Sequence, residues 1–176
     1  MKVIDLIFLD EFGASTNMTR TYARGPRGER VVCKTPCGHW KTISTIAAMT
    51  TQGILAAVSY DGAVNTEAFV GFIEQFLVPK LRPGQVLILD NLAAHKAAEV
   101  DRLIEAAGAR VMRLPPYSPD FNPIEMAISK VKALLRKHAA RQVNGLIDAI
   151  GQSLLAITPA DSQHFIRHSG YGATSG

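Results

Sequence analysis

Three acidic residues in this 176-residue chain are placed where they could act together. Asp10 follows the apolar run of residues 3–9, Asp90 follows a second apolar run at residues 86–89, and Glu125 falls in the first turn of a helical pattern. Mg²⁺ binds a few carboxylates and keeps waters and phosphate oxygens as its other ligands. Two such ions roughly 4 Å apart can activate an attacking oxygen and stabilise a leaving oxygen. The sequence therefore predicts a divalent-metal site for phosphate chemistry.

Each acid also has a purely structural interpretation. Asp10 and Asp90 could cap the turn or helix that follows each strand. In the stretch N-P-I-E, Asn122 could be the N-cap of a helix with Pro123 at its first position. Glu125 would then close a capping box and complement the helix dipole. These alternatives stay open for single residues, and it is the combination of three acids that favours a metal site.

Other residues near the acids could assist, and other chemistries are not indicated. Asn91 follows Asp90 directly, and His95 could orient a water or contact a phosphate, so both are candidate auxiliary residues; an ordinary hydrogen bond is the alternative for His95. Glu11 alternates to the opposite side of the strand from Asp10 and is not counted as a ligand. The sequence has no G-x-S-x-G elbow, no phosphate-binding P-loop and no H-E-x-x-H motif.

A zinc site is a further alternative that the sequence supports poorly. Cys33, Cys37 and His39 could be part of one, but a structural zinc normally takes four ligands with a tighter cysteine spacing. We therefore interpret the two cysteines as reduced thiols in a loop.

Hydrophobic periodicity predicts the elements that position the acids. The chain is expected to begin with strand 3–9, a long loop 13–39 with a short strand near 30–33, and a hairpin of 42–49 and 54–60. A helix capped by Asn65 and ended at Pro79 follows, and then strand 86–89, helix 96–107 and strand 110–114. The last expected elements are three helices, which begin at 123, span 145–157 and begin at 158. A hairpin beside β-α-β units gives a mixed sheet with helices on its faces. Right-handed crossovers can set the first strand parallel to strand 86–89, so that Asp10 and Asp90 emerge close together.

Composition and charge set bounds on the class of protein. With 47% hydrophobic and 19% charged residues, the chain is typical of one globular domain. No apolar run approaches the roughly 20 residues that cross a bilayer, so we expect no membrane partner and a cytoplasmic location. The formal net charge of +4 fits a polyanionic partner.

Several motifs match a known family. F-L-D-E-F-G-A-S, R-T-Y-A-R-G-P-R-G, G-H-W-K-T, V-L-I-L-D-N-L-A-A-H-K and L-P-P-Y-S-P-D-F-N-P-I-E occur in this order. Together they resemble the catalytic domain of DDE transposases, most closely the bacterial insertion-sequence members of the mariner superfamily. The resemblance spans residues 3–171, with 172–176 expected as a flexible tail. Relatives often carry Ser at the position of Phe12, a departure that leaves the acid triad intact.

The resemblance implies a fold and an activity. The fold would be ribonuclease-H-like, with a mixed five-stranded sheet flanked by helices on both faces. Asp10, Asp90 and Glu125 would be both the catalytic residues and the ligands of Mg²⁺ or Mn²⁺, with two ions bound. The activity would be hydrolysis of a phosphodiester at the transposon ends and transfer of the freed 3′-hydroxyl into target DNA. The alternatives are a ribonuclease-H-like nuclease that only hydrolyses and a catalytically silent DNA-binding remnant.

The resemblance also implies partners. DNA would be bound by basic residues in two segments, namely Arg20, Arg24, Arg27, Arg30, Lys41, Lys130, Lys132 and Arg136. The family's helix-turn-helix region would precede the catalytic domain, and Asp10 comes too early to leave room for it. We therefore expect a separate N-terminal DNA-recognition chain, a homodimer on DNA, and a bacterial cytoplasmic protein that associates with the nucleoid when it acts.

Overall fold

The computed structural model describes residues 2–32, 34, 36–90, 98–116 and 118–172. Its strands and helices are β1 (Leu6–Ser15), β2 (Thr42–Thr50), β3 (Gly53–Asp61), α1 (Thr66–Phe72), β4 (Val86–Leu89), α2 (Ala98–Ala106), β5 (Arg110–Arg113), α3 (Ile124–His138), α4 (Val143–Leu155) and α5 (Pro159–His168). A π-helical turn, Ile73–Leu77, and a 3-10 turn, Val78–Lys80, continue α1, and two more 3-10 turns are Val3–Asp5 and Pro119–Phe121. Among the described residues, no helix combines the length and the apolar character needed to cross a membrane.

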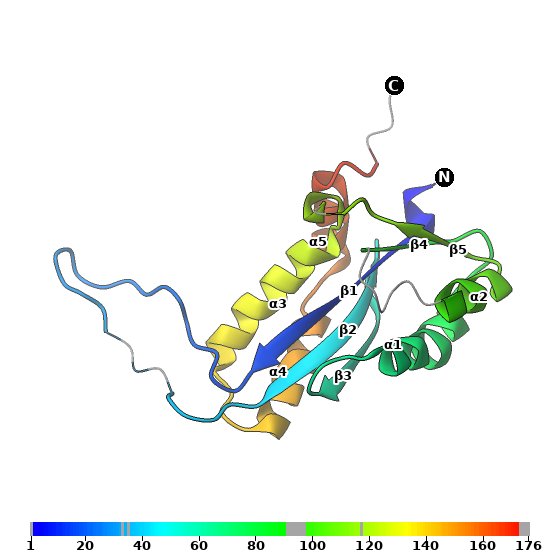
Figure 1. The fold of residues 1–176 in the computed structure, drawn as a ribbon. Coiled ribbons are helices and arrows are strands. Elements are labelled where there is room, and N and C mark those ends of the chain that lie inside the picture. The colour runs from blue at the N-terminus through cyan, green and yellow to red at the C-terminus, as the bar shows by residue number, and fades with distance from the viewer. Residues whose placement is uncertain (1, 33, 35, 91–97, 117, 173–176) are drawn as a thin grey trace.

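The five strands form one mixed sheet in the order β3-β2-β1-β4-β5 (Figure 1). β2 pairs antiparallel with both β1 and β3, while β4 pairs parallel with both β1 and β5. The hairpin turns at Gly53, whose φ of 109° favours glycine. The sheet confirms the predicted hairpin and the predicted parallel placement of β1 beside β4.

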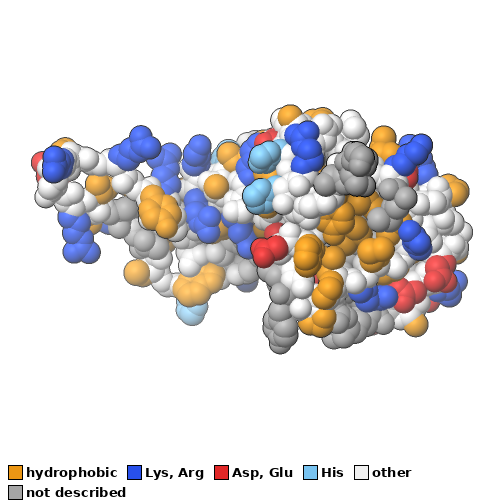
Figure 2. Space-filling view, turned by 90° about the horizontal axis from the view of Figure 1, so that it is seen from above, with side chains coloured by type: hydrophobic (Ala, Val, Ile, Leu, Met, Phe, Trp, Pro, Cys, Tyr) orange, Lys and Arg blue, Asp and Glu red, His pale blue; other side chains and the backbone are white. Residues whose placement is uncertain are grey.

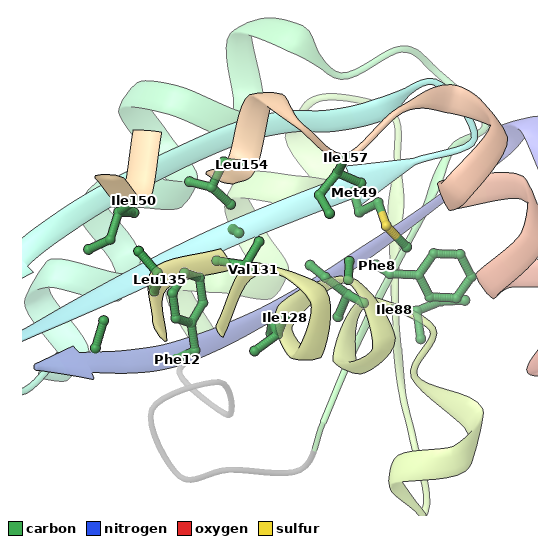
Figure 3. Close-up of a cluster of buried hydrophobic side chains, with 14 of the residues drawn as sticks. Phe8, Phe12, Met49, Ile88, Ile128, Val131, Leu135, Ile150, Leu154 and Ile157 are labelled. Carbon is green, nitrogen blue, oxygen red and sulfur yellow. The ribbon is translucent and has the colours of Figure 1, made fainter. Parts of the chain in front are cut away.

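Helices cover both faces of this sheet, because alternate strand residues are apolar on both sides. On one face, α3, α4 and α5 pack on even-numbered residues of β1 such as Phe8 and Phe12 (Figure 3). On the other face, α1 and α2 pack on odd-numbered residues such as Ile7 and Leu9. A residue's parity in β1 therefore tells which helices it faces.

Two helices begin at side-chain caps, and the cap at Asn65 confirms the prediction. The Asn65 side chain accepts a hydrogen bond from the Ala68 backbone N–H at 2.8 Å, which caps α1. Thr158 and Asp161 form a reciprocal capping box at the start of α5, where Pro159 occupies the first turn. Local sequence therefore determines where these two helices begin.

The first strand differs from its prediction. Residues 3–5 form a 3-10 turn, and β1 runs on to Ser15, so Asp10 lies within the strand and does not end it. The extension arises because Gly13, Ala14 and Ser15 pair with residues of β2. No strand is found near residues 30–33 among the described positions there, and this segment belongs to a long loop that projects from the body of the molecule (Figure 1).

Candidate active site

The first two predicted acids lie on neighbouring parallel strands. β1 and β4 pair in a constant register, with Leu6 opposite Val86, Ile7 opposite Leu87 and Phe8 opposite Ile88. The pairing ends at Phe8 and Ile88, and Asp10 and Asp90 each lie two residues further along the chain, Asp10 within β1 and Asp90 directly after the last residue of β4. Neighbouring strands lie about 4.8 Å apart. Asp10 has the same parity in β1 as Phe8, which lies on the face that α3 covers.

Asp10 is a buried carboxylate with specific hydrogen-bond donors. Only 8% of the residue is exposed. Its Oδ1 accepts from the Glu11 backbone N–H at 2.7 Å, and its Oδ2 accepts from the Asn122 side-chain amide at 3.3 Å. A buried carboxylate is costly unless such donors satisfy it. Asn122 thus ties the segment before α3 to the middle of the sheet.

The alternative interpretation of Asn122 and Glu125 as a capping box at the start of α3 is not borne out. The Asn122 side chain makes no capping hydrogen bond, and α3 begins after Pro123, which stands in the N-cap position. The backbone carbonyl of Asn122, and not its side chain, accepts from the Glu125 N–H at 3.0 Å. The Asn122 side chain is instead oriented so that its NH₂ group donates to Asp10. The carboxylate of Glu125 is therefore not used as a helix cap.

Glu125 is exposed at the mouth of a hollow. The hollow has a volume of about 370 Å³ and lies between the start of α3 and the end of α5. Its other lining residues are Asp120, Met126, Ser129, His168 and Ser169. Sequence patterns gave no indication of His168, because only the folding of α5 against α3 brings it near Glu125.

The structure brings Asp10 and Asn122 into contact, but it does not bring the three acids into one cluster. Within the described part of the chain, no three acidic, histidine or cysteine side chains are close enough to hold one ion. Carboxylates repel one another, so a close approach of all three depends on a cation's charge. The donor chemistry still suits Mg²⁺ or Mn²⁺, because the carboxylates and the Asn122 side chain offer hard oxygen ligands.

One atom beside Asp10 also lacks a hydrogen-bond partner. Asn122 is only 3% exposed, and among the described residues nothing donates to its side-chain oxygen, Oδ1. Leaving such an oxygen unsatisfied costs about 1–3 kcal/mol. An oxygen of this kind fits a site that takes a hard cation, which would satisfy it.

The predicted DNA-contact residues fall in two places. Arg20, Arg24, Arg27, Arg30 and Lys41 are exposed along the long loop, and Figure 2 shows basic side chains spread over this projection. Lys132 and Arg136 lie partly exposed on α3. Arg141 holds the base of the loop by donating from Nη1 to the carbonyls of Thr16 at 3.0 Å and Met18 at 2.9 Å. The loop is thus anchored at its base and basic along its length.

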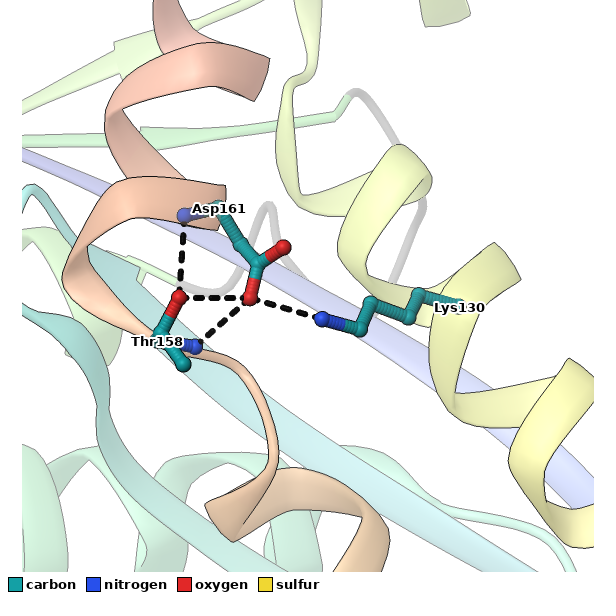
Figure 4. A network of polar contacts seen from close by, with 3 residues as sticks. All are labelled: Lys130, Thr158 and Asp161. Carbon is teal, nitrogen blue, oxygen red and sulfur yellow. Dashed lines mark hydrogen bonds and ion pairs between the residues drawn. The ribbon is translucent and has the colours of Figure 1, made fainter.

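Lys130 has a partner within the protein (Figure 4). Its Nζ lies 2.7 Å from Asp161 Oδ2, which also accepts from the backbone N–H and the hydroxyl of Thr158. These donors, Lys130 foremost, lower the pKa of Asp161 to about 2. The contact joins α3 to α5. Because Lys130 is already paired with Asp161, the ion pair disfavours the predicted contact of Lys130 with DNA, which stays a prediction.

Three other predicted positions cannot be placed. Asn91, His95 and Cys33 lie outside the described residues.

Comparison with known proteins gives the family and the fold. The model of the protein family described as DDE superfamily endonuclease matches residues 5–147. A search of curated protein sequences finds no match.

Among solved structures, the Mos1 transposase paired-end complex with left transposon end has a TM-score of 0.76 at 13% identity, over 94% of this chain and 52% of that one. The structure of Mos1 transposase catalytic domain and Raltegravir with Mg has a TM-score of 0.65 at 14% identity, over 94% of this chain and 78% of that one. This chain therefore spans about half the length of the Mos1 chain in the paired-end complex. The likeness confirms the predicted ribonuclease-H-like fold, and the family match shows that the chain belongs to the DDE superfamily endonucleases.

Proposed function

We propose that this chain is the catalytic domain of a DNA transposase. It would hydrolyse a phosphodiester at each transposon end and join the freed 3′-hydroxyl to target DNA. The observation that carries the proposal is the parallel pairing of β1 and β4, because Asp10 and Asp90 each follow the paired residues Phe8 and Ile88 by two positions. Membership of the endonuclease family and the Mos1 complexes with transposon DNA and with Mn or Mg support it.

Asp10, Asp90 and Glu125 would hold Mg²⁺ or Mn²⁺, in a site of two ions. When bound, the cations would activate the attacking oxygen and stabilise the negative charge on the leaving oxygen. Asp10 is kept in place by hydrogen bonds from Glu11 and Asn122, while the exposed Glu125 can be reached from solvent and can move. Strand transfer exchanges one phosphodiester for another and so needs no ATP.

DNA would be held mainly through its phosphates. Arg20, Arg24, Arg27 and Arg30 extend along the loop, with Lys41 at its base and Lys132 and Arg136 on α3. Contacts of this type give binding that weakens steeply with salt and carries little sequence information. Recognition of the element's ends would come from a DNA-recognition region, in the same chain or in a partner chain, and the complex on DNA would contain a homodimer. The bacterial insertion-sequence type and the nucleoid association belong to the same proposal.

Analysis of reaction products tests this function. Purified protein is incubated with Mn²⁺ and a labelled duplex that carries the element's end with an exposed 3′-hydroxyl, together with plasmid as target and the DNA-recognition partner. Labelled end joined to plasmid is the expected result, and Asp10→Asn should abolish it. Cleavage without joining would instead identify a hydrolytic nuclease. Absence of any Mn²⁺-dependent product would favour a silent DNA-binding domain.

A further inference from the structure

One side-chain amide next to the proposed metal site has only one of its two ends satisfied. Asn122 is almost fully buried, with 3% of the residue exposed. Its Nδ2 donates to Asp10 Oδ2 at 3.3 Å. Its Oδ1 is buried and has no hydrogen-bond donor among the described residues. The unsatisfied oxygen therefore belongs to the same carboxamide that touches the proposed metal ligand.

The orientation of this amide follows from chemistry. An ionised carboxylate can only accept hydrogen bonds, so the NH₂ group of Asn122 must face Asp10. The reversed amide would set two oxygens against each other. The side-chain oxygen consequently has to be satisfied by something other than Asp10.

The helix that follows does not satisfy this oxygen. The Glu125 N–H donates to the backbone carbonyl of Asn122 at 3.0 Å, and the Met126 N–H donates to that of Pro123 at 3.2 Å. The backbone N–H groups of Glu125 and Met126 thus already have acceptors. Asn122 also joins two of the proposed ligands, through its side chain to Asp10 and through its backbone to the turn that carries Glu125.

We propose that Asn122 belongs to the divalent-metal site, where it both positions Asp10 and offers an oxygen to the cation. Its NH₂ group fixes Asp10, and its Oδ1 is an oxygen donor for the cation, directly or through one of the cation's waters. Hard divalent cations accept amide oxygens as ligands, and groups that orient ligating carboxylates strengthen metal binding. The inference rests on the proposed function, because it assumes that Asp10 binds the metal.

Mn²⁺ affinity tests this role separately from catalysis. Isothermal titration calorimetry and the Mn²⁺-induced shift in melting temperature are measured on the whole chain, with and without a DNA duplex. Asn122→Leu should bind Mn²⁺ about 10–100-fold more weakly than the wild type. Asn122→Asp restores an oxygen donor and should bind more tightly than Asn122→Leu. Ser153→Ala is the matched control, because Ser153 Oγ is also buried without a partner among the described residues but lies in α4. Its Mn²⁺ affinity should equal that of the wild type.

The outcomes separate this inference from the proposed function. If the wild type binds Mn²⁺ and Asn122→Leu binds it equally well, Asn122 has no part in the site and the inference is wrong. If Asn122→Leu does not fold, the comparison moves to Asn122→Ser, whose shorter side chain cannot keep both contacts; wild-type affinity in that variant would also overturn the inference. If the wild type itself binds no Mn²⁺ with DNA present, the metal site of the proposed function fails, and the role of Asn122 fails with it.

Discussion

The side chain of Asn122 donates to Asp10 across 3.3 Å and so joins two residues that are 112 positions apart in the sequence. The contact brings the start of α3 to the strand that carries the first acid. It also removes Asn122 from the helix-capping role that its position before Pro123 suggests. The orientation that brings the NH₂ group of Asn122 to Asp10 leaves its side-chain oxygen without a helix N–H as donor.

Glu125 should be needed for catalysis and dispensable for stability. Glu125→Gln should change the free energy of unfolding by less than about 0.5 kcal/mol, because the residue is exposed and caps nothing. The same variant should lose Mn²⁺-dependent DNA cleavage by about 100-fold or more, because even residues that only support metal ligands contribute about 10–100-fold. Urea denaturation and a plasmid-nicking assay measure the two effects.

Thr158→Ala is the control for a real cap. Thr158 accepts from the Asp161 N–H at 3.2 Å, so its removal should cost about 1 kcal/mol. A loss of similar size in Glu125→Gln would show that Glu125 stabilises the helix after all.

The link between α3 and α5 should weaken in acid. The pKa of Asp161 is lowered to about 2, mainly by Lys130 and then by Thr158. A lowered folded-state pKa gives stability that is present above the unfolded-state value of about 3.9 and is lost as pH falls toward 2. The side chain of Asp161 is 25% exposed, so solvent reduces the effect to about 1 kcal/mol.

Asp161→Asn measures this contribution. The variant should be less stable than the wild type at pH 7, and the difference should shrink between about pH 5 and pH 2, as the linkage requires. Chemical denaturation across that range gives the curve. A difference that stayed constant with pH would show that the charge of Asp161 does not matter.

The loop arginines should set the salt dependence of DNA binding. Arg24 and Arg27 are exposed on the projecting loop. The slope of log affinity against log salt is negative. Replacing both arginines with alanine should reduce its magnitude by about 0.9 for each phosphate that an arginine no longer neutralises. Fluorescence anisotropy with a labelled duplex measures the slope.

Arg102→Ala is the matched control for those substitutions. Arg102 is an exposed arginine on α2, paired with Glu99, on the sheet face opposite α3. Its removal should leave the slope unchanged. An equal decrease per arginine removed, in the loop variant and in Arg102→Ala, would indicate general charge attraction and no defined loop contact.

The sequence predicted the sheet well because strand and helix periods are local signals. The hairpin, the cap at Asn65 and the parallel placement of β1 beside β4 are all confirmed. The extension of β1 to Ser15 could not be foreseen, because it depends on pairing with the distant strand β2.

The site was predictable only in its parts. The acids follow apolar runs, which made Asp10 and Asp90 visible in the sequence. The role of Asn122, the ion pair of Lys130 with Asp161 and the position of His168 near Glu125 all depend on contacts between distant segments. Local sequence carries no information on such contacts.

Mn²⁺-dependent nicking of supercoiled plasmid by Asp90→Asn tests the central claim most directly. Asp148→Asn, which changes an exposed aspartate on α4, is the matched control. The register of β1 and β4 predicts that Asp90→Asn keeps the fold but loses nicking, while Asp148→Asn nicks as the wild type does. Wild-type nicking by a correctly folded Asp90→Asn protein would contradict the proposed metal site.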